Sequence, residues 1–180
     1  MKPIADLARK SDWQVAAREV CRGERSLEPL RRSLLDPAHG LKAPQALRVQ
    51  QRAGYLLLHV HWRCPERLDE LLPELLGLVE PGGPRTHASI ARQVFSVFQD
   101  RPLPECLAGR CFAAAVATFA DRGAPTAARA RALDAAANVA RQFAGLWPEL
   151  AALAADVPPD EPPGVRSIAG RVALEAARNL

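Results

Sequence analysis

A few side chains in this sequence have types and spacings that suggest metal chemistry. His59, His61 and Cys64 lie close together, and His87 is a candidate fourth ligand. Imidazole nitrogens and thiolate sulfurs are ligands that zinc prefers. On a helix, however, His59 and His61 are two positions apart and point to nearly opposite sides. Three ligands cannot converge there unless the helix end unwinds, so we predict no metal site.

Catalytic groups are equally hard to find. Cys111 lies on an apolar stripe, where a cysteine is expected to be a small buried hydrophobe rather than a nucleophile. The sequence has no Ser-His-Asp set and no glycine-rich phosphate loop. Asp134 and Asn138 are four residues apart, and we interpret Asp134 as the partner of an arginine inside the fold. We therefore predict no catalytic residue, no cofactor and no enzyme activity.

Four arginines recur at intervals of 40, 39 and 40 residues: Arg52, Arg92, Arg131 and Arg171. Evenly spaced polar side chains in stacked helices usually bond to acids or carbonyl groups of the neighbouring unit. We therefore interpret the arginines as a ladder that links repeats. A stripe that faces a ligand is the alternative.

Two tryptophans are candidate surface aromatics. Trp62 and Trp147 both lie near expected helix ends. Trp147 directly precedes Pro148, and we interpret its ring as packing on that turn. Presentation of the ring to a base or a peptide is the alternative.

Apolar residues at helical spacing place all these side chains on helices. The expected helices cover 3–22 (a short helix followed by a better-defined one), 26–36, 44–63, 66–79, 86–101, 104–121, 125–143, 148–157 and 164–180. Ser11 and Thr86 are expected helix caps, and Gly23 is expected to end the first helix. The uninterrupted stripe from Leu68 to Val79 is the clearest helical pattern in the chain.

Composition supports an all-α fold and a soluble protein. Of 180 residues 48% are hydrophobic, leucine and alanine dominate, and the net charge is +4. The four cysteines show no CxxC spacing, and the N-terminus lacks the apolar region of a signal peptide. These features favour a reducing cytoplasm. The longest apolar run is too short for a bilayer span, so we expect no membrane association.

The arginine spacing also indicates a repeat of two helices per unit. Aligning the first helices on their arginines predicts buried residues two and five positions later. A period near 40 is typical of the HEAT and armadillo class of α-solenoid. We expect one domain over 1–180: a capping hairpin (1–42), three hairpin repeats (43–157) and a C-terminal capping helix (164–180).

Residues 44–180 resemble the small, mostly uncharacterised bacterial HEAT-repeat proteins. The resemblance is clearest in AARARALDAAANVARQFAGLWPELAALAADV (127–157) and GVRSIAGRVAL (164–174). It implies a right-handed α-solenoid of stacked hairpins. It implies little about function, since such solenoids serve as scaffolds, nucleic-acid enzymes and chaperones.

Charge separates the two remaining functions. The second helices carry more acidic than basic residues, whereas the first helices carry more basic ones. Second helices line the concave side of HEAT stacks, so an acidic groove is expected, which opposes phosphate binding there. The sequence therefore predicts a scaffold that binds a protein partner. The alternative is a nucleic-acid-binding protein that uses the arginines of the first helices, with a role in DNA base repair as one form of this alternative.

Overall fold

The structure is a computed structural model that describes residues 3–37 and 41–180. Over these ranges it contains helices and no strand, which confirms the all-α prediction. The α-helices are α1 (Lys10–Cys21), α2 (Glu28–Leu35), α3 (Ala43–His61), α4 (Leu72–Gly77), α5 (Ile90–Phe98), α6 (Glu105–Ala120), α7 (Thr126–Gln142), α8 (Trp147–Ala155) and α9 (Pro163–Ala176). The 3-10 helices are η1 (Ile4–Asp6), η2 (Pro65–Leu71) and η3 (Ala144–Leu146).

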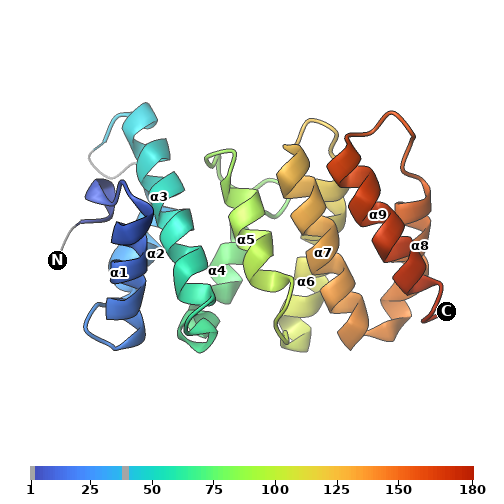
Figure 1. Ribbon diagram of the computed structural model, residues 1–180, viewed down its shortest axis with the longest axis horizontal. Coiled ribbons are helices and arrows are strands. Elements are labelled where there is room, and N and C mark those ends of the chain that lie inside the picture. The colour runs from blue at the N-terminus through green and yellow to red at the C-terminus, as the bar shows by residue number, and fades with distance from the viewer. Residues whose placement is uncertain (1–2, 38–40) are drawn as a thin grey trace.

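The helices lie in two layers along the long axis of the molecule (Figure 1). The first layer, in front in Figure 1, contains α1, α3, α5, α7 and α9, and the second layer behind it contains α2, α4, α6 and α8. Within the first layer α3 packs on α5, α5 on α7 and α7 on α9. Between the layers α2 packs on α3, α6 on α7 and α8 on α9. The chain therefore progresses from one end of the molecule to the other.

The core positions predicted from the arginine alignment are confirmed. The residues two positions after each arginine are Gly54, Val94, Leu133 and Ala173, and those five positions after are Leu57, Val97, Ala136 and Ala176. All are buried except Ala173, which is half-buried. Gly54 has a packing reason, because a Cβ atom there would lie 1.9 Å from Oε1 of the buried Gln93 on α5.

The predicted helix over 66–79 is wrong as a single element. The chain instead forms η2 and then the short α4. Pro73 is the physical reason, because proline has no backbone N–H and its ring displaces the carbonyl four residues earlier. It fits only in the first turn of a helix, which is where α4 places it.

Two predicted helix caps are also wrong. Asp12, rather than Ser11, caps α1, since its carboxylate accepts the backbone N–H of Arg9 at 3.1 Å. The helix expected from Thr86 begins only at Ile90. Before it, the His87 backbone N–H donates to Gln50 Oε1 at 2.7 Å, a bond outside the helix. Gly23 ends α1 as predicted, with a φ of 75° that glycine adopts without strain.

Amide side chains, two of them buried (Gln50 and Asn138), tie the connecting segments to the helices. Gln50 on α3 also donates to the carbonyl of Leu34 at 2.8 Å. On α7, Asn138 donates to the carbonyls of Phe98 at 2.8 Å and Arg101 at 2.7 Å. Gln142 accepts the backbone N–H of Leu103 at 2.8 Å. These hydrogen bonds satisfy backbone groups where α2 and α5 end, because the apolar side chains of the core cannot form hydrogen bonds with them.

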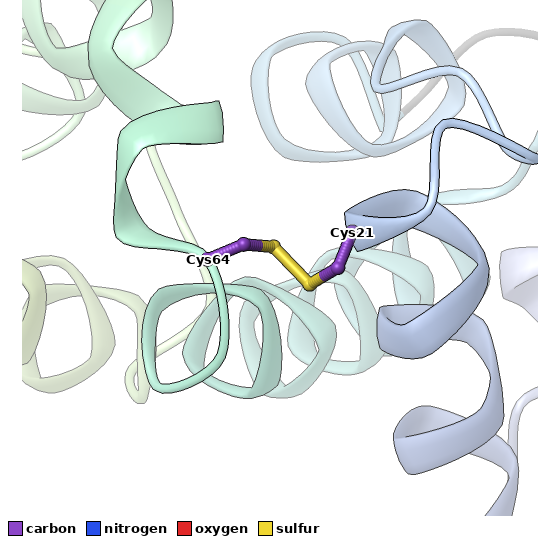
Figure 2. Close-up of a disulfide and its surroundings, with 2 residues drawn as sticks. All are labelled: Cys21 and Cys64. Carbon is purple, nitrogen blue, oxygen red and sulfur yellow. A yellow bond between two sulfur atoms is a disulfide. The ribbon is translucent and has the colours of Figure 1, made fainter.

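A disulfide joins the first helical pair to the next unit. Figure 2 shows Cys21, the last residue of α1, bonded to Cys64, which follows α3. The two Cα atoms are 5.7 Å apart. The cysteine spacing gave no sign of this bond, since the residues are 43 positions apart and belong to different predicted units.

We predict that reducing this disulfide lowers the free energy of unfolding by about 2–4 kcal/mol, because the bond restricts the unfolded chain. Urea unfolding with and without dithiothreitol measures the effect. The Cys21→Ser/Cys64→Ser variant should match the reduced protein and no longer respond to dithiothreitol. A Cys106→Ser variant, which changes an exposed free thiol, should behave as wild type. Equal stability of the oxidised and reduced proteins would refute the prediction.

Candidate functional site

The four arginines of the predicted ladder occupy matching places in the first layer. Arg52 lies on α3, Arg92 on α5, Arg131 on α7 and Arg171 on α9. These helices follow one another in sequence order along the molecule (Figure 1). The side chains nevertheless divide into two pairs with different surroundings.

Arg131 and Arg171 share the carboxylate of Asp134. Arg131 Nη1 lies 3.2 Å from Asp134 Oδ2 and 2.9 Å from Gln99 Oε1. Arg171 bonds the other carboxylate oxygen of Asp134 from the next helix of the layer. The prediction that Asp134 pairs with an arginine inside the fold is confirmed. This half of the ladder links α7 to α9 and to the residue that follows α5.

Arg52 and Arg92 are different, since both are half-buried and neither guanidinium has an ion-pair or hydrogen-bond partner among residues 3–37 and 41–180. Their helices contain no aspartate or glutamate. Tyr55 and Phe95 stand where Asp134 stands relative to Arg131. Withdrawing a cation from water without a nearby anion costs free energy. The N-terminal half of the ladder therefore carries positive charge that the described fold does not neutralise.

Other arginines bridge neighbouring units through carboxylates. Both oxygens of each of three glutamates accept bonds from one arginine, in the pairs Arg31–Glu74, Arg110–Glu80 and Arg141–Glu175. Hydrogen bonding by the arginine lowers the pKa of the glutamate in each pair. These contacts hold units together and are structural.

The most enclosed ion pair in the described chain lies near its C-terminal end. Arg129 and Glu161 are 5% and 7% exposed, and the guanidinium bonds both carboxylate oxygens, at 2.6 and 3.0 Å. Arg129 also donates to the carbonyl of Phe119 at 2.8 Å. The hydrogen bonds that Arg129 donates to the carboxylate lower the pKa of Glu161. The pair fixes the proline-rich segment before α9 against α7.

We predict that acid destabilises the protein through these glutamates. Their folded pKa values lie below the unfolded value, so their contribution is complete above the unfolded pKa of about 4.3. It is lost as pH falls through the folded values. Melting temperatures from pH 7 to pH 2.5 should fall below about pH 5, with a smaller fall in Glu175→Gln. A melting temperature that is constant or rises on acidification would contradict this.

One face of α3 combines arginines with aromatic rings. The α3 stripe consists of Arg48, Arg52, Tyr55, His59 and Trp62, at successive steps of four or three residues. Such steps bring side chains to one side of a helix. The helix therefore presents guanidinium groups along its first half and rings along its second half.

The rings of the stripe form a cluster with Trp13 of α1. The Trp13 and Tyr55 rings stack with centroids 4.5 Å apart, and Trp62 meets His59 edge-on at 5.2 Å. Trp62 is 62% exposed, Trp13 and Tyr55 are half-buried, and His59 is buried. Burial lowers the pKa of His59, and the positive charges of Arg63 and Lys10 lower it further.

The two candidate surface tryptophans differ in exposure. Trp62 lies at the surface as predicted. Trp147 is only 1% exposed, so its assignment as a surface aromatic is wrong. It is the first residue of α8, and the following proline is accommodated in the first turn. The ring is directed into the core, as the interpretation of packing on the turn requires.

The residues considered as metal ligands do not converge. Cys64 is held in the disulfide, and His61 Nε2 lies 3.1 Å from Asp100 Oδ1. His87 Nδ1 lies 2.9 Å from Ser89 Oγ. Among residues 3–37 and 41–180 no group of three or more His, Cys, Asp or Glu side chains is placed to hold a metal ion. Burial raises the pKa of the Cys111 thiol to about 12, so this residue is protonated at neutral pH.

The second layer presents small side chains and carboxylates. Gly109, Ala113 and Ala117 form an exposed stripe along α6, which lies between α4 and α8 in the layer (Figure 1). Three exposed carboxylates lie near the starts of α4, α6 and α8: Glu70 stands two residues before α4, Glu105 is the first residue of α6 and Glu149 is the third residue of α8. None of the three forms an ion pair with any residue that the structure describes.

A cleft of about 480 Å³ lies between the turn after α3 and the turn after α5. Its lining includes Trp62, Glu66, Asp69, Asp100 and Arg101. Arg101 bonds Asp69, which leaves the cleft with an excess of carboxylates. The surface next to Trp62 on the side of this cleft is therefore negatively charged.

Comparison of the chain with protein-family models, with curated proteins and with solved structures finds no match. We therefore infer function from the residues and their geometry. Sequence reasoning missed the ring cluster and the disulfide. The steps of the α3 stripe were a usable signal for the first, whereas nothing in the spacing pointed to the second.

No helix in the described part of the chain is both long enough and apolar enough to cross a membrane.

Proposed function

We propose that the chain is a right-handed α-solenoid of the HEAT-like class and acts as a non-catalytic scaffold for a protein partner. A single domain would comprise a capping hairpin over 1–42, three hairpin repeats over 43–157 and a capping helix over 164–180. The two layers of helices and the burial of the aligned repeat positions support this architecture. Resemblance to small HEAT-repeat proteins remains part of the proposal.

The exposed second-layer face is the observation that carries the scaffold function. Gly109, Ala113 and Ala117 present little side-chain bulk, so a partner helix can approach α6 closely. Glu70, Glu105 and Glu149 supply carboxylates along the same layer with no partner in the described chain. Arg110, the one basic residue of α6, is already bonded to Glu80.

Complementary charge identifies the chemistry of the partner. Unpaired carboxylates around an uncharged stripe favour a segment with lysine or arginine beside small or apolar residues. The partner that we propose is therefore a basic, amphipathic helix of another protein.

Site-specific photocrosslinking tests this proposal. A photoreactive amino acid replaces Ala113 on the second-layer face, and the matched control carries it at Ala127, an exposed alanine of α7 in the first layer. We predict that irradiation of cells yields a protein adduct at position 113 and not at 127. Peptide mapping should place the adduct in a Lys/Arg-rich segment.

Charge reversal provides the second arm of the crosslinking experiment. Glu70→Lys, Glu105→Lys and Glu149→Lys together should lower the adduct yield by about tenfold or more, because like charges across an interface are strongly unfavourable. Equal adducts at positions 113 and 127, or an adduct unaffected by the reversal, would reject the second-layer face as the binding site.

The cellular location expected from the sequence, a reducing cytoplasm, remains a prediction. The Cys21–Cys64 bond weighs against it, because structural disulfides persist in oxidising compartments and are rare in the cytosol.

A further inference from the structure

We propose that the α3 stripe, together with Arg92 of α5, is a binding surface for single-stranded nucleic acid. The surface lies in the first layer, on different helices from the second-layer face assigned to the protein partner. The two assignments can therefore fail independently.

Uncompensated positive charge is the first observation that points to an anionic ligand. Arg52 and Arg92 are half-buried with no carboxylate on either of their helices. They occupy matching places on packed neighbouring helices, whose axes are separated by about 8–10 Å. Arg48 extends the same face by one turn and is exposed. An anion bound across these groups offsets the desolvation that the fold imposes on the half-buried pair.

The other two arginines of the ladder differ from Arg52 and Arg92 in having an acidic partner. Arg131 and Arg171 stand at the same repeat position, but Asp134 neutralises both. The chain therefore contains the same arginine in two settings, one bonded within the fold and one left without a partner in the described residues. Only the second setting, at Arg52 and Arg92, has charge to offer a ligand.

The rings are the second observation, and they select the class of anion. Trp13, Tyr55 and Trp62 all retain exposed surface, and Tyr55 lies one turn from Arg52 on α3. The positive charges of Arg63 and Lys10 act on the buried His59 at the centre of the cluster and lower its pKa. Aromatic faces beside cations are how proteins hold unpaired bases and their phosphates. An acidic peptide would use the arginines but has no need of the rings.

The surrounding charge sets the extent of the surface. Beyond Trp62 lie the carboxylates of Glu66 and Asp100, together with Asp69, which Arg101 bonds. This excess of negative charge repels a phosphate chain. The bound single-stranded nucleic acid therefore runs from Trp62 along α3 toward Arg48 and across to Arg92. Bases that stack on the ring cluster must be free of a complementary strand, so single-stranded nucleic acid is preferred over duplex.

Fluorescence anisotropy with a labelled 12-nucleotide oligouridine tests the proposal on the full chain. Wild-type protein should bind at low salt. The logarithm of the affinity should fall with the logarithm of salt concentration with a slope of about −2 to −3.5, as expected for three to five phosphate contacts on a single strand. A 12-base-pair duplex should bind more weakly.

Paired variants separate this surface from general positive charge. Arg52→Gln/Arg92→Gln should weaken binding by about tenfold and reduce the salt slope. Trp62→Ala, a change at an exposed side chain, should weaken binding by about fivefold or more. The matched control Arg131→Gln/Arg171→Gln should bind within about twofold of wild type. Circular dichroism confirms that each variant is folded.

Four results would overturn the proposal. The first is that the wild-type protein does not bind the oligonucleotide at low salt. The second is that the control pair weakens binding as much as Arg52→Gln/Arg92→Gln does, and the third is that the duplex binds as tightly as the single strand. The fourth is that polyglutamate competes as well as unlabelled oligouridine while Trp62→Ala has no effect on binding. That result would assign the surface to an acidic protein segment instead.

Discussion

The helices of this chain bury their apolar faces against the helices beside them in the two layers, and the rest of the structure depends on that packing. The middle of the molecule shows it most clearly. α7 packs on α5, α6 and α9, and its core side chains are mostly alanine, so helix backbones approach closely. Apolar contact alone leaves the ends of helices unsatisfied. Asn138 and Gln142 on α7 supply bonds to the backbone where α5 ends.

Arginine pairing follows from the same stacking and divides structure from function. Arginines that bridge two units have a carboxylate within reach, as Arg141 does with Glu175 and Arg129 with Glu161. α3 and α5 contain no acidic residue, so Arg52 and Arg92 are packed by their helices but not neutralised. On the second layer the imbalance is reversed. The two layers therefore offer different chemistry to partners, basic and aromatic on α3, small and acidic around α6.

Most of the helices and their buried positions could be predicted from the sequence because both follow from local periodicity. Other features depend on how segments meet in space. Pro73 was visible in the sequence, but the apolar stripe around it outweighed it in the prediction. The disulfide joins two cysteines that share no motif, and the ends of α1 and α3 bring them together. Equal spacing of the four arginines concealed that only Arg131 has an aspartate three residues later on its own helix.

The central claim is that one half of the arginine ladder holds the stack together while the other half is left for a ligand. The most direct measurement is the free energy of unfolding, by urea titration, of Arg131→Gln/Arg171→Gln beside Arg52→Gln/Arg92→Gln. The account predicts a loss of about 1 kcal/mol for the first pair, since partly exposed ion pairs contribute on that scale, and no loss for the second. An equal loss from both pairs would contradict it.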